Sequence, residues 1–340
     1  MIVKNTLLFI VLAEILSFLG YFYQWVNFIA FFIIIVLVLI LSLYKLEYGL
    51  FILLTELFIG SFGYLFYFEN HGLKISLRLA LWLIIISVWL AKTILDWIKN
   101  KKLSIVFLKS AYFFYFFVLF IFIAWGAVNG FLENNSLNNI FFDANNWLYF
   151  LLVFPIFSVL QSDNNLKIIK QIFLTSIGWL SFKTIILAYI FSHNFYFFAL
   201  DLYLWVRRSG VGEITQVVPG FSRIFMQSHI FVLIGFFILL FYLLKLMVAR
   251  NDKKELFISY FLLLALYLSA IIISFSRSFW LGLAVGGCFV WLSAIFKLKI
   301  SFKKFMVFNL MALAAVVLSL ALILLIIKFP YPAPAGGFNS

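Results

Sequence analysis

Long apolar runs, separated by short polar breaks, dominate the pattern of hydrophobic and polar positions along the chain. The eleven runs begin near Thr6, Trp25, Leu46, Ile75, Ile105, Trp147, Gln171, Arg223, Leu256, Phe279 and Phe305. Each is close to the roughly 20 residues that a helix needs to cross a bilayer core about 30 Å thick. Lipid offers the backbone no hydrogen-bond partners and no alternating barrel pattern occurs, so the runs are predicted to be helices. The sequence therefore predicts an all-α, polytopic integral membrane protein, with about eleven transmembrane helices in a single domain over residues 1–340.

The composition supports a membrane protein and changes how the net positive charge is interpreted. Of the 340 residues, 66% are hydrophobic and 11% are charged, and the mean hydropathy is +1.16, far above that of a soluble domain. A net charge of +13 would ordinarily suggest a nucleic-acid partner. Because no basic soluble domain is present, we interpret the charge as a topology signal, with the lipid bilayer and not nucleic acid as the partner.

The basic residues fall unevenly on the two sides of the predicted helices. With the N-terminus in the cytoplasm, seventeen of the twenty-five Lys and Arg residues lie on the cytoplasmic side. The positive-inside rule therefore predicts a cytoplasmic N-terminus and a C-terminus on the outer face.

Arginines and lysines are also distributed differently between the two predicted faces of the membrane. Five of the six arginines fall on the predicted outer face: Arg78, Arg207, Arg208, Arg223 and Arg277. Topology rules treat the two residue types alike, whereas the planar guanidinium group of arginine suits bidentate contacts with phosphate or carboxylate. The sorting favours an anion-binding outer face. The alternative is chance combined with arginine head groups that reach lipid phosphates.

A single arginine lies between two long apolar runs. Arg277 lies in the short stretch 274–278 between the runs Leu256–Ile273 and Phe279–Phe296. The stretch is predicted to be an outer-face helix turn that carries a permanent charge.

Two other outer segments contain candidate residues. Residues 193–222 are predicted to form a loop, with an aromatic interfacial segment followed by Arg207, Arg208 and glycines. With Arg223 at its end, this loop could fold over a phosphate or could be an ordinary exposed loop, and the sequence leaves both open. Asp143, just before the sixth run, is predicted to be a helix N-cap. The alternative for Asp143 is a carboxylate that binds the acceptor or acts as an acid or base.

Three ionisable residues lie inside predicted spans, where charges are costly and usually paired or functional. Counted from the cytoplasmic side, Glu56 and Lys183 lie at depths that agree within roughly 3 Å, at 1.5 Å per helical residue. We predict a structural ion pair between these two residues. Glu14 has no assigned partner.

Motifs for nucleotide binding and for metal binding are missing from the sequence. It contains no phosphate-binding loop, dinucleotide-binding glycine pattern or H-E-x-x-H motif, and its three histidines are scattered. The sequence therefore predicts no metal site and no cofactor. His229, six residues after Arg223, is the one histidine that is a candidate acid or base.

The stretch Ile272–Gly282, with its Ser-Phe-Ser-Arg-Ser core, resembles the helix turn of the O-antigen ligase and O-antigen polymerase superfamily of membrane glycosyltransferases. An earlier outer loop ending in arginine and the many flanking spans extend the resemblance over nearly the whole chain. It implies transfer of a glycan from undecaprenyl pyrophosphate to a lipid A core or glycan acceptor, without a metal, on the outer face of the bacterial cytoplasmic membrane.

The resemblance also implies roles for individual residues. Arg277 corresponds to the arginine of the helix turn, and Arg223, with Arg207 or Arg208, corresponds to the loop arginine; these residues would hold the pyrophosphate. Family members carry a histidine in a large outer loop, so residues 330–340 are expected to begin such a loop and the chain to be cut short there. A transporter or flippase for a lipid-linked polyanionic substrate is the alternative function, and a structural membrane subunit is a third.

Overall fold

The computed structural model describes residues 2–70, 73–101, 105–193, 195–218, 220–248, 254–298 and 300–329. It is mainly helical, and nine helices in these ranges are long and apolar enough to cross a membrane. This agrees with the helical, membrane-protein character expected from the apolar runs. The expected outer loop at 330–340 lies outside the described residues.

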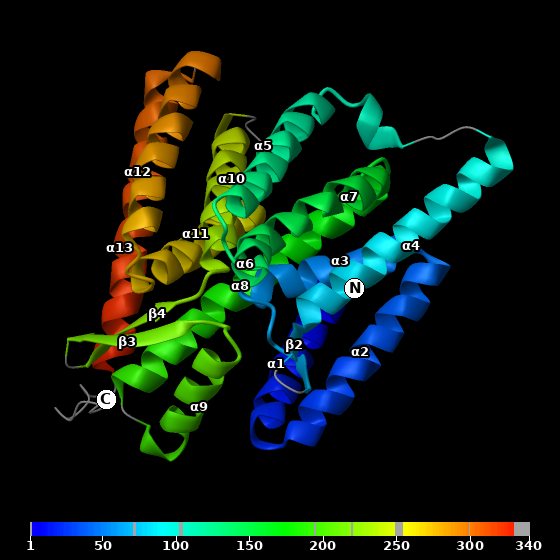
Figure 1. Cartoon of the computed structure of the whole chain (residues 1–340). Helices are drawn as coiled ribbons and strands as arrows, with labels where there is room; N and C mark the ends of the chain where they lie inside the picture. The colour runs from blue at the N-terminus through cyan, green and yellow to red at the C-terminus, as the bar shows by residue number, and fades with distance from the viewer. Residues whose placement is uncertain are drawn as a thin grey trace. The chain divides into compact units, whose positions relative to one another are not determined.

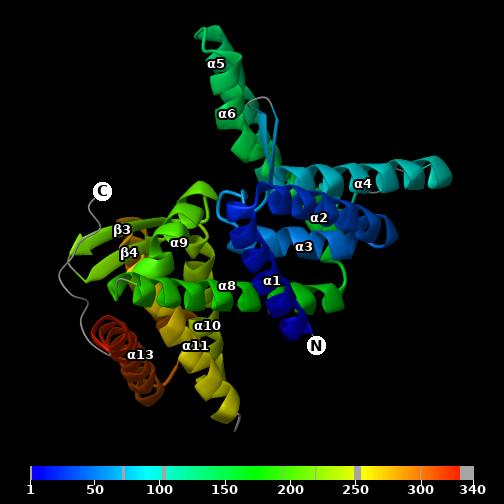
Figure 2. The same cartoon turned by 90° about the horizontal axis from the view of Figure 1, so that it is seen from below.

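Most of the helices and strands are labelled in Figures 1 and 2. Those of the N-terminal part are α1 (Ile2–Phe22), α2 (Gln24–Tyr44), α3 (Leu46–Ile59), β1 (Tyr67–Asn70), β2 (Leu73–Ser76), α4 (Leu77–Asn100), η1 (Val106–Lys109), α5 (Phe113–Leu132), α6 (Leu137–Leu148), η2 (Tyr149–Leu152) and α7 (Val153–Val159). Those of the C-terminal part are α8 (Asp163–Ser192), α9 (Tyr196–Arg208), β3 (Glu213–Val218), β4 (Phe221–Phe225), α10 (His229–Val248), α11 (Lys254–Ile273), α12 (Arg277–Leu292), η3 (Ser293–Lys297) and α13 (Phe302–Lys328).

Two of the expected spans coincide with shorter helices. The run that begins at Leu46 forms α3, whose 14 residues extend only about 21 Å at 1.5 Å per residue. The chain leaves the helix at Gly60 and Ser61, and Ser61 has a left-handed φ of 48°. The run that begins at Trp147 forms the apolar helical stretch Tyr149–Val159. Apolar residues continue beyond the end of α3, as far as Phe68, so a hydropathy window overestimates the length of that helix.

Two small antiparallel sheets depart from the all-α expectation. Strands β1 and β2 form one hairpin, and β3 and β4 form another. Both lie in segments that connect helices, so the helical class holds for the rest of the described chain.

The described chain divides into two compact units. The first comprises Met1–Phe28, Thr55–Phe66 and Gln171–Ser340, and the second comprises Ile29–Leu54 and Tyr67–Lys170. The candidate arginines 207, 208, 223 and 277 belong to the first unit. Asp143 belongs to the second.

In the first unit, α11 packs against both α10 and α13. The Ser319 hydroxyl on α13 donates a hydrogen bond of 2.9 Å to the carbonyl of Ala265 on α11. The Tyr267 hydroxyl on α11 donates one of 3.2 Å to the carbonyl of Leu174 on α8. Small and hydroxyl-bearing residues let membrane helices approach closely and satisfy one another's polar groups. Helix α11, which leads to Arg277, is therefore held from several sides.

In the second unit, α4 makes hydrogen bonds to residues that are distant in the sequence. The Ser76 hydroxyl caps α4 by accepting from the Leu79 amide at 3.2 Å. The Trp82 indole nitrogen donates to the Leu148 carbonyl at 3.1 Å, and Lys92 Nζ donates to the Ser42 carbonyl at 2.9 Å. These bonds connect α4 to the end of α6 and to α2.

Candidate functional site

Arg277 is the first residue of α12, directly after a three-residue reversal of the chain. The Ser274 hydroxyl donates to the Ile271 carbonyl at 2.6 Å, and the Phe275 amide donates to the Ile272 carbonyl at 3.1 Å. Phe275 adopts a left-handed φ of 47°, which completes the reversal. The Arg277 side chain is exposed, and no hydrogen bond or ion pair joins it to another residue in the described ranges. Its charge is therefore available to a bound anion.

The N-terminus of α12 adds backbone donors beside this charge. The amides of Phe279 and Trp280 both donate to the Ser276 carbonyl at 3.1 Å, whereas the Ser276 side chain makes no capping bond. The amides of Arg277 and Ser278 have no acceptor in the described part of the chain. Uncapped amides and the helix dipole favour negative charge at such an end. Arg277 and the N-terminus of α12 therefore both favour a negatively charged ligand.

Strand β4 brings a second arginine to this turn. Arg223 Nε donates a hydrogen bond of 2.9 Å to the Ser274 carbonyl. The Arg223 guanidinium also lies over the ring of Phe225, 4.9 Å from its centroid. Two ring contacts hold the strand against the turn, one between Phe221 and Phe275 at 5.3 Å and one between Phe225 and Phe279 at 5.9 Å. Arg223 is thus fixed against the turn that carries Arg277.

The alternation of side chains along β4 explains why Arg223 points to the turn. Ser222 and Ile224 are buried, whereas Phe221, Arg223 and Phe225 alternate with them and are partly exposed. Successive side chains of a strand point to opposite faces, so the last three share the face that contacts the α11–α12 turn. Gly220, at φ 78°, provides the left-handed position in the connection to β3. This hairpin was not predicted from the sequence, where residues 193–222 were expected to form a loop; Pro219 and Gly220, a sequence pair typical of turns between two short segments rich in β-branched and aromatic residues, were the available signal.

Arg207 and Arg208 are engaged elsewhere, at the C-terminal end of α9. Arg207 Nη1 donates to the Tyr203 hydroxyl at 2.5 Å, and the Arg208 guanidinium lies 5.6 Å from the ring centroid of Tyr21. Both side chains are exposed. Within the described residues, no hydrogen bond or ring contact joins either of them to Arg223 or Arg277. Residues 193–222, expected as a loop, instead contain α9 and β3, which pack together (Figure 2).

His229, the candidate acid or base, lies in the interior of the first unit. It is fully buried. Its Nδ1 accepts from the Met226 amide at 3.3 Å, so Nε2 carries the hydrogen and donates to Thr184 Oγ1 at 2.8 Å. The Thr184 hydroxyl in turn donates to the Leu180 carbonyl at 2.8 Å. Nε2 therefore joins α10 to α8, Nδ1 holds the turn that precedes α10, and the arrangement supports a structural role for His229.

Lys183 forms a buried ion pair, but its partner differs from the predicted one. Lys183 Nζ contacts Glu14 Oε1, and both side chains are buried. The Trp179 indole nitrogen donates to Glu14 Oε2 at 2.9 Å. The predicted pair of Lys183 with Glu56 is therefore corrected to Lys183 with Glu14. Equal depth in the membrane did not identify the partner, because depth does not determine which helices are neighbours.

Asp143 is not a helix N-cap. Helix α6 begins at Leu137, and its cap is Ser136, whose hydroxyl accepts from the Asn139 amide at 3.3 Å. Asp143 lies in the middle of α6 and is exposed. In the same unit, Arg78 is buried near the start of α4, unlike the exposed Arg207, Arg208 and Arg277 of the first unit. The cap expectation failed because the helix starts earlier than the apolar run does.

The described residues contain no group of three or more His, Cys, Asp or Glu side chains that could hold a metal ion. No protein-family model, curated protein or solved structure matches the chain. The geometry of the α11–α12 turn and the resemblance of its sequence are therefore the two indications of function.

Replacement of Arg223 by alanine should reduce stability more than replacement of Arg207. A hydrogen bond to a charged group contributes about 1.5–3 kcal/mol, and the lower end applies to the half-buried Arg223. We expect Arg223→Ala to lower the free energy of unfolding by about 1.5 kcal/mol. The exposed Arg207→Ala should change it by less than about 0.5 kcal/mol. Thermal unfolding of both variants in phospholipid nanodiscs measures the difference, and equal shifts would contradict the role given to Arg223.

Proposed function

We propose that this protein is a membrane glycosyltransferase of the O-antigen ligase or polymerase type. It transfers a glycan from undecaprenyl pyrophosphate to a lipid or glycan acceptor at the outer face of the bacterial cytoplasmic membrane. The observation that carries the proposal is the hydrogen bond from Arg223 to the turn that positions Arg277. It brings two permanent cations to one uncapped helix end, inside the segment that resembles this superfamily.

The chemistry of the leaving group matches this arrangement. In the transfer, an acceptor hydroxyl attacks the anomeric carbon of the first sugar and loses its proton to a base. The bond from that carbon to the pyrophosphate oxygen breaks, and undecaprenyl pyrophosphate leaves with the electron pair. Preorganised donors directed at such developing charge stabilise the transition state. Arg277 and the first amides of α12 would face the pyrophosphate, while Arg223 fixes the turn and adds charge.

The proposed topology follows from the distribution of basic residues and can be tested separately. The N-terminus would be cytoplasmic, which places the α11–α12 turn outside and the start of α13 inside. In a Cys288→Ser background, we expect Ser278→Cys to react with a membrane-impermeant maleimide added to intact cells. The matched variant Lys303→Cys should react only after permeabilisation. Labelling of Lys303→Cys in intact cells would overturn this orientation.

A transporter or flippase for a lipid-linked anionic substrate is the second candidate. The observation that favours it is the buried Glu14–Lys183 pair in two helices of membrane-spanning length, since buried ion pairs at such depth often mark substrate or ion pathways. A flippase would move the lipid-linked glycan across the bilayer without forming a new glycosidic bond. A transferase would form that bond and release undecaprenyl pyrophosphate.

The two functions are distinguished in proteoliposomes that contain the protein and an undecaprenyl-pyrophosphate-linked oligosaccharide. We expect acceptor-dependent release of undecaprenyl pyrophosphate and a longer glycan, both detected by mass spectrometry. The same vesicles without acceptor are the control. Movement of the lipid-linked glycan without bond formation would support the flippase and overturn the transferase.

A further inference from the structure

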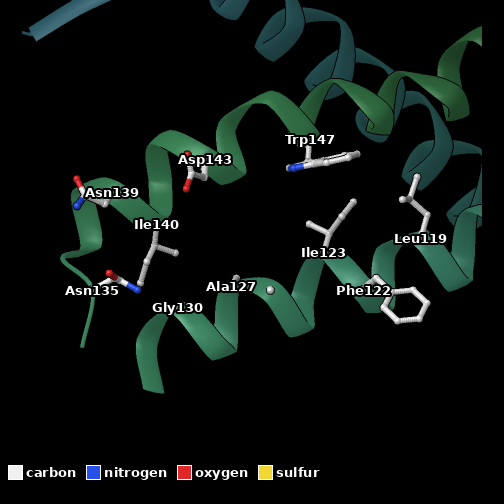
Figure 3. Close-up of a pocket in the computed structure, with 11 residues that line it drawn as sticks. Leu119, Phe122, Ile123, Ala127, Gly130, Asn135, Asn139, Ile140, Asp143 and Trp147 are labelled. Carbon is white, nitrogen blue, oxygen red and sulfur yellow. The ribbon is translucent and has the colours of Figure 1, made fainter. Parts of the chain in front are cut away.

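Helices α5 and α6 form a hairpin with an open groove of about 640 Å³ between them. Figure 3 shows the groove, with Asp143 and Trp147 on the side of α6 that faces α5. Ile123 points from α5 toward Trp147, and Asn135 lies in the turn that joins the helices. The groove belongs entirely to the second unit. It is distinct from the α11–α12 turn of the first unit, and no function has yet been assigned to it.

The wall contributed by α5 leaves space for a ligand. Gly126, Ala127 and Gly130 line the groove, and a side-chain carbon placed at Gly126 would meet no atom within 4 Å. Glycine is unfavourable in a helix interior relative to alanine, but at this position it leaves the wall of the groove open. Larger side chains at these positions would reduce the volume of the groove.

The wall contributed by α6 provides polar groups and one large aromatic ring. Asp143 supplies carboxylate oxygens, and Asn135 and Asn139 supply amides that both donate and accept hydrogen bonds. Trp147 is 42% exposed, so one of its ring faces is open to a ligand. Hydroxyl-rich rings with apolar C–H faces are recognised by this combination, because hydroxyls bond to carboxylate and amide groups while the C–H face packs on an aromatic ring.

The charge of the groove excludes the phosphate part of the proposed substrate. No lysine or arginine is among the described residues that line it, and its acidic side chain, Asp143, offers a phosphate no counter-charge. A phosphate would therefore be repelled, whereas a neutral sugar or an amino sugar would not. An acyl chain alone would gain nothing from Asp143, Asn135 and Asn139.

We propose that the α5–α6 groove binds a neutral or amino sugar unit, with Trp147 under the sugar ring and Asp143 bonded to its hydroxyl or ammonium groups. This deepens the proposed function, on which the identity of the sugar as part of a transferred glycan rests. Anion recognition at Arg277 and sugar recognition at Trp147 are then separate tasks of separate units.

The test measures sugar binding without requiring catalysis. The full-length protein is placed in phospholipid nanodiscs, which avoid sugar-based detergents, and saturation-transfer NMR is recorded with galactose, glucose, N-acetylglucosamine and glucosamine. Gly126→Leu fills the groove at a position with free space, and leucine is the better helix former, so the variant should fold. Trp147→Ala removes the aromatic surface, and Asp143→Asn removes the charge. Each variant is checked for thermal unfolding before use.

Matched controls come from the same hairpin. Trp125 is an exposed tryptophan of α5, and Glu133 is the exposed carboxylate at the end of α5; neither lines the groove. Trp125→Ala and Glu133→Gln should therefore bind the sugars as the wild-type protein does. They show whether loss of any tryptophan or carboxylate in this hairpin is sufficient to change the signal.

We expect at least one sugar of the panel to receive saturation from the wild-type protein, and the signal to fall about fivefold or more in Gly126→Leu and Trp147→Ala. Asp143→Asn should reduce the preference for glucosamine over galactose. The proposal is overturned if no sugar receives saturation, or if Gly126→Leu and Trp147→Ala retain the wild-type signal. Failure of the transferase assay with intact sugar binding would reject the proposed function and leave the groove as a sugar site. Glycan transfer without groove-dependent sugar binding would reject the sugar site and leave the proposed function in place.

Discussion

Replacement of Arg277 by alanine is expected to lower glycan transfer by at least about a hundredfold, because loss of one preorganised donor at a developing negative charge costs about 10²–10³ in rate. The Arg277 side chain is exposed and has no partner among the described residues, so its removal should leave the fold intact. The measurement is acceptor-dependent release of undecaprenyl pyrophosphate in proteoliposomes, normalised to the amount of folded protein. Transfer at the wild-type rate would reject the pyrophosphate site.

A matched control separates a specific role from loss of positive charge. Lys328, at the end of α13, is exposed and lies on the same predicted outer face. Lys328→Ala removes one positive charge there without altering the α11–α12 turn. We expect this variant to keep transfer within about twofold of the wild type, since exposed charges away from a site interact weakly. An equal loss in both variants would indicate a general electrostatic effect.

Arg277→Lys tests the geometry of the contact. Lysine keeps the charge but replaces a planar fork of donors with a point charge on a flexible stem. If the arginine holds two pyrophosphate oxygens at once, lysine should restore less than about a tenth of the activity, since loss of one charged hydrogen bond of about 1.5 kcal/mol corresponds to roughly tenfold. Full rescue by lysine would show that charge alone is sufficient.

The helical class was predictable because hydropathy is a property of composition over about 20 residues. The lengths of individual helices were less predictable. The end of α3 depends on the backbone conformation at Ser61, and apolar residues on both sides of such a turn conceal it from a hydropathy window. The β3–β4 hairpin was missed for a related reason, since its strands of five or six residues lie in a segment with aromatic and basic residues that also suits an interfacial loop.

The candidate site shows what sequence can and cannot identify. Arg277 stood out because its charge lies alone between two apolar runs, and Arg223 because it ends an outer loop with further arginines. The structure brings Arg223 to the turn of Arg277 through a backbone carbonyl. That both arginines hold one pyrophosphate stays a prediction. The partner of Lys183 was misassigned because Glu14 and Glu56 are both plausible at its depth, and only helix packing selects Glu14. The burial of His229 depends on the same packing of α8 against α10.

Replacement of Lys183 by methionine is expected to reduce the free energy of unfolding by about 3–5 kcal/mol, because it leaves Glu14 as an uncompensated buried charge. Both partners are less than a tenth exposed, so solvent does little to screen the charge that remains. Lys170→Met is the matched control, since Lys170 is an exposed lysine on the same helix. Its effect should stay below about 0.5 kcal/mol. Thermal unfolding in phospholipid nanodiscs gives both values.

The double variant Glu14→Gln with Lys183→Met distinguishes structural from functional use of the pair. Glutamine keeps an oxygen that can accept the Trp179 indole hydrogen, and methionine fills much of the lysine volume, so most of the lost stability should return. A double variant as unstable as Lys183→Met would contradict this account of the pair. If stability returns and transfer continues, the pair is structural and the transferase proposal holds. If stability returns but substrate movement is lost, the pair lies on a pathway through the membrane, as the flippase alternative requires.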